Sequence, residues 1–242
     1  MSDNRVYQLY AGSGLTLTAA GSLVVSDDMV CLVDPASIND INELDELLKP
    51  FPVCSKDVNT IFYTHLHFDH FNLSDVNKLA DVIYMPQREV AYINALMCHK
   101  DDEDAYRKFL TESHDYIAPV FVRQFIRYRN DERYCLDSVM KNYPVTLLDG
   151  IEEIANGVRT VPLPGHCAGQ LGLEITERNR TVMIAGDAVL SEEDWRQTDI
   201  SNHFIIYDSM EWHMTRARLN LVDEIIPGHG RRFSTEEIAI LS

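Results

Sequence analysis

The sequence has no long run of apolar residues, although 45% of its 242 residues are hydrophobic. No stretch approaches the roughly 18 consecutive apolar residues of a membrane-spanning helix. The first residues also lack the basic-then-apolar pattern of a secretion signal. We therefore expect no transmembrane segment and no membrane partner. A chain of this length and hydrophobic content can bury a large core, so we expect residues 1–242 to form a single domain.

Cysteines are few, odd in number and widely spread, and no two of them form a C-x-x-C pair. This pattern argues against a disulfide framework, which small secreted proteins use, and favours reduced thiols. We therefore expect a cytoplasmic protein. The five are Cys31, Cys54, Cys98, Cys135 and Cys167.

Basic residues are scarce: 21 Lys and Arg stand against 38 Asp and Glu, which gives a formal net charge of −17. Long-range repulsion disfavours binding to a phosphate backbone, so we expect a small-molecule substrate and no nucleic-acid partner. The clearest basic cluster is either the solvated face of a helix or an edge that recognises anions. It comprises Arg123, Arg127, Arg129 and Arg133.

The order of predicted elements indicates two similar halves. Short apolar runs from Val6 to Val33 predict antiparallel strands, and apolar residues at helical spacing predict a helix over Ile41 to Leu48. Strands followed by helices, twice over, indicate two sheets packed face to face with helices outside. The remaining predicted strands are Thr60 to Tyr63, Val82 to Met85, a group within Val145 to Val161, Leu171 to Thr176, Thr181 to Ala185 and Glu224 to Ile226; further helices are predicted over Trp212 to Leu221 and Thr235 to Leu241.

Between the two halves, from about residue 87 to residue 141, charged residues and helix formers dominate. Pro119 is the main break in this stretch. We predict an insertion of two or three helices here.

Histidines and aspartates occur in one particular order along the chain. The run Thr64-His65-Leu66-His67-Phe68-Asp69-His70 comes first, and single residues follow between glycines and prolines. Imidazole nitrogen and carboxylate oxygen suit zinc and similar cations. Seven such groups exceed the four that one tetrahedral zinc takes, so they predict two metals that share a bridging carboxylate, a hydrolytic centre. The predicted ligands are His65, His67, Asp69, His70, His166, Asp187 and His229.

Each predicted ligand comes just after the carboxyl end of a predicted strand. The four residues of the first motif cannot share one face of a regular helix, but a loop that leaves a strand can bring them together. Gly186 lets the chain bend tightly next to Asp187, and His229 lies between Gly228 and Gly230. This shared context supports a common site.

These motifs resemble those of the metallo-β-lactamase superfamily, and the resemblance spans essentially the whole chain. It implies an α+β fold, a four-layer αββα sandwich with the metal site at one edge of the paired sheets. It also implies that His65, His67 and His166 hold one metal, that Asp69, His70 and His229 hold the other, and that Asp187 bridges them. The full set is similar to that of dinuclear hydrolases such as glyoxalase II, the lactonases and ribonuclease Z. Leu190 stands where quorum-signal lactonases have tyrosine, which argues against a close copy of a lactonase.

Such a centre predicts a mechanism. A water between two metals loses a proton at neutral pH and attacks a carbonyl or phosphoryl centre. Besides binding metal, Asp69 is predicted to orient this nucleophile or to carry the proton to the leaving group. Asp34 either supports a ligand from behind or caps the Asp34-Pro35 turn.

Three functions fit this centre. The first is hydrolysis of an ester, thioester, lactone or amide bond in a small molecule. The second is a phosphodiesterase or ribonuclease that uses the same metals, and the third is a metal-binding regulator without turnover. The sequence favours zinc, with iron and manganese as alternatives.

The helical insertion is expected to cover the site and to select the substrate, and a homodimer formed through it is a further option. Its aromatic residues either line the pocket or pack against the sandwich. They are Tyr92, Tyr106, Phe109, Tyr116, Phe121 and Phe125. Cys167 is expected to be an inert buried cysteine. The remaining histidines lack a ligand context and are expected to be surface or structural residues: His99, His114, His203 and His213.

Overall fold

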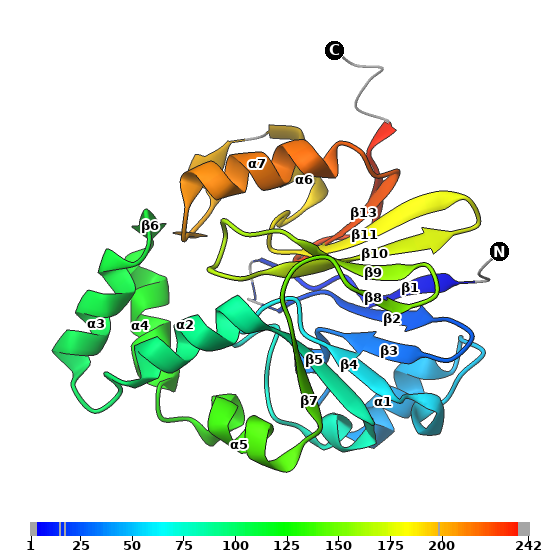
Figure 1. Ribbon diagram of the computed structural model, residues 1–242, viewed down its shortest axis with the longest axis horizontal. Coiled ribbons are helices and arrows are strands. Elements are labelled where there is room, and N and C mark those ends of the chain that lie inside the picture. Colours follow the sequence, from blue (N-terminus) through cyan, green and yellow to red (C-terminus); the bar gives the residue numbers. More distant parts are fainter. Residues whose placement is uncertain (1–3, 15, 17, 198, 237–242) are drawn as a thin grey trace.

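A computed structural model describes residues 4–14, 16, 18–197 and 199–236. Two six-stranded sheets pack face to face and helices cover their outer sides (Figure 1). This arrangement confirms the predicted α+β class and its αββα layers. In the first sheet the strand order is β1 (Arg5–Tyr10), β2 (Gly21–Val25), β3 (Val30–Val33), β4 (Thr60–Phe62), β5 (Val82–Pro86) and β7 (Val145–Leu148).

The second sheet comes from the other half of the chain. Its strand order is β14 (Phe233–Ser234), β13 (Glu224–Pro227), β11 (Arg180–Gly186), β10 (Leu171–Glu177), β9 (Val158–Pro162) and β8 (Glu153–Ala155). Strands β3, β4, β5 and β7 run parallel to one another in the first sheet, and β11 and β13 run parallel in the second. Parallel strands end at the same edge, so the loops that follow them gather there.

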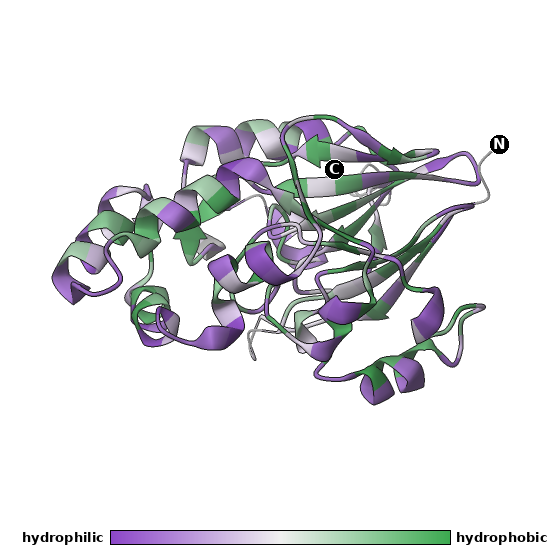
Figure 2. Cartoon of the chain, turned by 60° about the horizontal axis from the view of Figure 1, so that its bottom comes forward, coloured by the Kyte–Doolittle hydropathy of each residue, from purple (hydrophilic) through white to green (hydrophobic). Residues whose placement is uncertain are grey.

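The core lies between the sheets and consists of side chains that face inward from both. Val24 and Phe62 of the first sheet pack in one buried cluster with Leu173 and Ile184 of the second. In Figure 2 apolar residues concentrate on the strands, whereas the outer helices carry hydrophilic residues. Burial of this apolar surface is the main force that holds the sheets together.

Helices cover the outer face of each sheet. Helix α1 (Ile41–Leu48) buries Leu44 and Leu48 against the first sheet, and Asp40 caps its start by accepting a hydrogen bond from Glu43 N. On the second sheet lie α6 (Glu192–Gln197) and α7 (Ser209–Leu219). None of the helices in the part of the chain described here is long and apolar enough to cross a membrane.

The insertion contains four helices, where two or three were predicted. They are α2 (Gln87–Met97), α3 (Glu103–Glu112), α4 (Pro119–Tyr128) and α5 (Leu136–Asn142). A short strand of the insertion, β6 (Tyr116–Ile117), pairs with β12 (Ile205–Ile206). Figure 1 shows α3 and α4 beyond the end of the sandwich, where they form a small apolar cluster with Leu96 of α2 and Ile205 of β12.

Of two other predicted helices, one begins earlier in the structure than predicted, and the other lies mostly outside the described residues. Helix α7 begins three residues before Trp212, because Asp208 caps it by accepting a hydrogen bond from Glu211 N. The helix predicted over Thr235 to Leu241 lies mostly outside the described residues.

Candidate metal centre

The first motif lies in the loop that follows β4. A tight turn closes this loop, since the backbone N–H groups of His70 and Phe71 both donate to the carbonyl of His67, at 3.0 and 2.9 Å. The start of the loop is held by Asp34, whose carboxylate accepts hydrogen bonds from Thr64 N and Thr64 Oγ1. The strand end and this turn together aim the side chains of the motif toward one point.

The other three residues come from loops of the second sheet. His166 follows β9, Asp187 follows β11 and His229 follows β13. These loops approach one another very closely: a Cβ added to Gly228 would lie 1.8 Å from Asp187 Oδ1. Only glycine fits at this point without displacing the aspartate.

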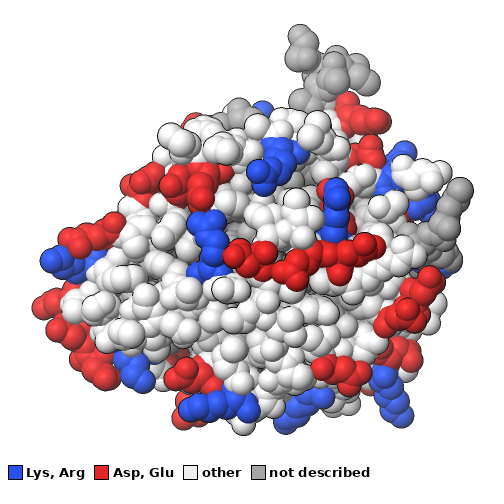
Figure 3. Space-filling view, viewed as in Figure 1, with Lys and Arg blue, Asp and Glu red and all other residues white. Residues whose placement is uncertain are grey.

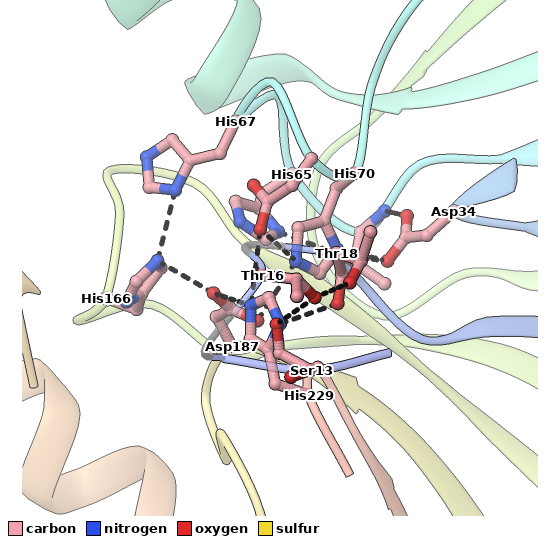
Figure 4. Close-up of polar contacts among 12 residues, drawn as sticks. Ser13, Thr16, Thr18, Asp34, His65, His67, His70, His166, Asp187 and His229 are labelled. Atoms are coloured by element: carbon pink, nitrogen blue, oxygen red, sulfur yellow. Dashed lines mark hydrogen bonds and ion pairs between the residues drawn. The ribbon is translucent and has the colours of Figure 1, made fainter. Parts of the chain in front are cut away.

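All seven predicted residues converge (Figure 4). Their ligand atoms form three overlapping groups with spacings within 4.8 Å: His65 with His67 and His166, His65 with His70 and Asp187, and Asp69 with His70 and His229. His166 Nε2 lies 3.1 Å from His67 Nδ1, and His229 Nε2 lies 3.3 Å from Asp69 Oδ2. The first and third groups match the two ligand sets that the sequence resemblance implied.

Asp187 lies between these two groups. Its Oδ1 atom is 3.0 Å from His70 Nε2, and its Oδ2 atom is 3.4 Å from His166 Nε2 and 3.2 Å from His229 Nε2. One carboxylate therefore reaches histidines of both groups, as a bridging ligand must.

The buried polar atoms of the cluster fit a pair of cations. His65 Nε2 is buried without a hydrogen-bond partner within the described residues, and His70 Nε2 and Asp187 Oδ1 face each other at 3.0 Å without forming a hydrogen bond of good geometry. Burial of such atoms is costly unless something pairs with them. Divalent cations at this point would satisfy all three, and nitrogen and carboxylate donors suit zinc, iron or manganese.

The electrostatics also suit metal binding. Burial lowers the pKa of His65 and His67 well below its usual value, and it lowers the pKa of His166 to about 3. These three rings are therefore neutral and offer lone pairs. Burial raises the pKa of Asp187, but His229 and His70 lower it by more than burial raises it. The net shift is well downward, so this group is a carboxylate.

Several of these histidines have a second partner on the side away from the cluster. His70 Nδ1 lies 2.8 Å from Asp34 Oδ2, His229 Nδ1 lies 2.9 Å from the Thr18 carbonyl, and His65 Nδ1 lies 3.0 Å from Thr64 Oγ1. Such partners orient metal-binding rings. The structure decides between the two roles of Asp34, because its side chain supports His70 and makes no capping bond at the turn that follows it.

The insertion borders the centre on the side of His67. The ring of Phe125 in α4 lies 5.5 Å from the ring of His67 and 4.8 Å from that of Phe68. Behind these rings lies a cavity of about 380 Å³ lined by Tyr106, Phe125 and Tyr134, among others. Two of the six predicted aromatic residues, Tyr106 and Phe125, thus line a pocket.

The other four pack elsewhere. Tyr92 contacts Phe109 and Tyr207, Phe121 stacks on Phe204, and Tyr116 is 51% exposed. Tyr92, Phe109 and Phe121 pack against the apolar cluster of the insertion, whereas the alternative interpretation placed these residues against the sandwich, and Tyr116 is exposed.

The predicted basic cluster does not form a continuous patch. Arg133 pairs with Asp131, and Arg129 pairs with Glu103, whereas Arg123 and Arg127 are exposed. On the face drawn in Figure 3, basic side chains stand among more numerous acidic ones. This arrangement favours the interpretation of a solvated helix face.

A second buried polar group near the centre was missed from the sequence. His203 was expected to be a surface or structural residue, and its ring is buried. His203 Nε2 lies 2.9 Å from Asp194 Oδ1, and Arg216 donates to Asp194 Oδ2 at 2.7 Å. The Arg216 guanidinium also contacts the rings of Trp195 and Trp212. These residues come from three short segments of the chain and form no recognisable motif.

Cys167 and Glu89 lie behind the centre. Cys167 is buried, as predicted, and burial raises the pKa of its thiol well above the usual value, so the thiol is unreactive. Glu89, at the start of α2, is fully buried and accepts a hydrogen bond from Gly169 N at 3.1 Å. It joins the insertion to the loop that carries His166.

The fold and this cluster define a class of protein: an αββα sandwich whose histidines and aspartates gather at one edge. The family model described as "Metallo-beta-lactamase superfamily" matches residues 21–229. The chain therefore belongs to the metallo-beta-lactamase superfamily, whose members are generally metal-dependent hydrolases. Among curated protein sequences no match is found.

Solved structures share the fold at low sequence identity. A putative metallo-beta-lactamase from Thermotoga maritima is 17% identical, with a TM-score of 0.63 over 96% of this chain and 99% of that one. A variant of AiiA from B. thuringiensis, with N-decanoyl-L-homoserine bound at its active site, is 17% identical, with a TM-score of 0.56 over 90% and 88%. A quorum-quenching N-acyl homoserine lactone hydrolase is 17% identical, with a TM-score of 0.55 over 90% and 87%. These similarities support the fold.

Proposed function

We propose that the protein is a hydrolase that holds two divalent cations, preferably zinc, and cleaves an ester, thioester, lactone or amide bond of a small molecule. The observation that carries this proposal is the position of Asp187, whose two oxygens lie within 3.4 Å of histidines from both ligand groups. A site for one metal would not need such a carboxylate.

The seven side chains would form two sets of ligands with Asp187 in common. His65, His67 and His166 would hold one cation, and Asp69, His70 and His229 would hold the other, with Asp187 between them. The bound cations would supply an activated water and polarise the carbonyl of the substrate.

Asp69 is the residue of the cluster best placed to move a proton. Its side chain is 15% exposed, whereas those of His70, His229 and Asp187 are at most 7% exposed. The Asp69 carboxylate would take the proton from the attacking water and pass it to the leaving group.

The surroundings favour an uncharged substrate of modest size. The net charge of −17 repels polyanions, and several aromatic rings, among them those of Phe68 and Phe125, line the cavity next to the first motif. Two of the similar structures carry N-decanoyl-L-homoserine or are named for hydrolysis of N-acyl homoserine lactones, so acyl lactones belong among the first substrates to test.

The test compares four substrate classes on zinc- and manganese-loaded protein: thioesters, lactones, bis-p-nitrophenyl phosphate and single-stranded RNA. We expect cleavage of a thioester or lactone, and His67→Ala should lose zinc and activity together. His213→Ala, which changes an exposed histidine of α7, is the control and should retain both. Cleavage of the phosphodiesters alone would support the nuclease alternative, and inertness with two bound metals would support a regulator.

A further inference from the structure

His166 differs from His65, His70 and His229 in its outer nitrogen. Each of these three histidines has a hydrogen-bond partner on that side. His166 uses Nε2 toward the cluster, whereas its Nδ1 atom is buried and has no partner among the described residues. A metal-binding histidine normally donates its second N–H to a carboxylate, a carbonyl or a water. His166 therefore lacks a partner that its proposed role requires.

The neighbouring ring has the complementary deficit. The ring of His203 lies 6.4 Å from that of His166, and His203 Nδ1 is also buried, with no partner in the part of the chain that the structure describes. The other nitrogen of this ring, Nε2, faces Asp194 Oδ1 at 2.9 Å. Two buried nitrogens without a partner among the described residues thus belong to adjacent rings whose centroids are 6.4 Å apart, a separation that rules out a direct hydrogen bond and at which one water can bridge two facing nitrogens.

Asp194 holds His203 firmly in place. Its carboxylate accepts hydrogen bonds from Arg216 Nη1 at 2.7 Å and from Leu190 N at 2.9 Å. The Arg216 side chain is itself fixed, because Nη2 donates to the carbonyls of Asp194 and Trp195. The Leu190 carbonyl accepts from His229 N, so the same network reaches another predicted ligand.

We propose that His203 is a positioning residue that orients His166 through a single water between their Nδ1 atoms. This inference rests on the proposed metal-binding function. The hydrogen bonds along the chain are consistent in direction: with Nε2 of His166 facing the cluster, its Nδ1–H donates to the water. The water donates to His203 Nδ1, and His203 Nε2–H donates to the Asp194 carboxylate, which Arg216 neutralises. A His203 ring that carries its proton on Nε2 can accept from the water and donate to Asp194 at the same time.

The first test measures zinc binding by competition with a chromophoric chelator. We expect His203→Gln to lower the affinity for one of the two zinc ions by about 10–100-fold, because loss of an outer partner typically costs that much affinity. The affinity for the other ion should not change. The matched control is His114→Gln. His114 is also buried and bonded at one nitrogen, to the Leu110 carbonyl, but it belongs to the insertion, and its variant should bind both ions normally.

The outcomes separate the two proposals. Two zinc ions in the wild-type protein with unchanged affinities in His203→Gln would overturn the role of His203 and leave the proposed function standing. An equal loss at both sites would show a general structural effect and would also overturn that role. A wild-type protein that binds no zinc would overturn both proposals.

A second test needs no variant and so does not depend on the folding of His203→Gln. Long-range ¹H–¹⁵N NMR spectra of the zinc-loaded wild-type protein report which nitrogen of each histidine carries the proton. We expect His203 to be protonated at Nε2 and His166 at Nδ1, with the latter proton protected from exchange. A His203 protonated at Nδ1 would reverse the direction of the chain and overturn the proposal.

Discussion

At the scale of single residues, Asp34 ties together both ends of the loop that carries the first motif. Its carboxylate accepts from Thr64 N at 2.8 Å and Thr64 Oγ1 at 2.7 Å, where the loop begins, and it contacts His70 Nδ1 at 2.8 Å, where the motif ends. The residue has a left-handed backbone conformation, with φ of 49°, which is uncommon for a residue other than glycine. The surrounding hydrogen bonds offset this strain.

Asp34→Asn should weaken zinc binding at the group of Asp69, His70 and His229 by about 10–100-fold. An amide has only one oxygen, so it cannot accept all three hydrogen bonds, and its NH2 group opposes the donor of His70. Competition with a chelator measures the loss. Asp40→Asn is the control, because asparagine caps α1 as well as aspartate does. Equal zinc affinities in the two variants would contradict this prediction.

Glu89 is a residue whose ionisation opposes folding. Burial raises the pKa of its carboxyl from 4.5 to about 7, against the opposing effects of hydrogen bonds from Cys167, Gly169 and Leu66. Between these two pH values the unfolded chain loses the proton while the folded protein keeps it. The free energy of unfolding therefore falls as pH rises from about 4.5 to about 7, and the contribution of Glu89 stays constant above that range.

Glu89→Gln should remove this fall, which amounts to about 3 kcal/mol as an order of magnitude. Urea unfolding at pH 5 and pH 8, in the presence of a chelator, measures it in the wild-type protein and the variant. We expect the variant to lose less stability than the wild-type protein between these pH values. Glu112→Gln, an exposed glutamate of α3, should behave as the wild-type protein does. Parallel pH profiles for the wild-type protein and Glu89→Gln would refute the assignment.

At the scale of elements, the site depends on how closely the loops after β11 and β13 approach each other. Gly228 N donates to the Val189 carbonyl and Gly228 O accepts from Ala20 N, so its backbone is held on two sides. Asp187 lies directly against the position that a side chain would occupy. A shift of either loop would move the carboxylate that lies between the two ligand groups.

Gly228→Ala should therefore displace Asp187 and cost about 1–3 kcal/mol of stability, as overpacking does. The same change should lower the affinity for zinc, because the bridging position is lost. Denaturant unfolding and zinc titration measure the two effects. Gly14→Ala is the control, since an added Cβ there meets no atom within 4 Å. A stable Gly228→Ala that binds two zinc ions would show that Asp187 has no bridging role.

The sequence predicted the strands better than the helical insertion. Strands such as β4 and β11 are apolar runs with polar residues directly after them, so both their position and their carboxyl ends could be inferred. The breaks between α2 and α3 and between α4 and α5 contain neither proline nor glycine. Helix α2 ends at Met97, and Asp102 caps α3 by accepting from Ala105 N, whereas Pro119 marks the remaining break as the first residue of α4.

The candidate site shows the same contrast. Four of its residues lie in one short motif, and the others follow strand ends, so all of them could be predicted from the sequence. The supporting network of His203, Asp194 and Arg216 could not be found in this way. Its members come from three separate segments, and only the tertiary fold places His203 next to His166.

At the scale of the whole molecule, the metal centre joins the two sheets. The group of His65, His67, Asp69 and His70 follows a strand of the first sheet, whereas His166, Asp187 and His229 follow strands of the second. Each proposed cation therefore draws ligands from both sheets. Such cations would also offset the repulsion among buried and half-buried carboxylates in a protein whose net charge is −17.

Removal of the metals should consequently lower the melting temperature of the whole protein. Binding to the folded state alone stabilises it by about 2.7 kcal/mol per ion when free zinc is 100 times the dissociation constant. For a chain of this size, that corresponds to a shift of roughly 5–10 °C per ion. Thermal unfolding with zinc and with a chelator measures the difference, and elemental analysis confirms the loss of metal. In His67→Ala the chelator should have a smaller effect, because one ion is already bound weakly. A melting temperature that is the same with and without zinc would mean that the cluster does not cross-link the sheets through metal, whatever the distances between its side chains.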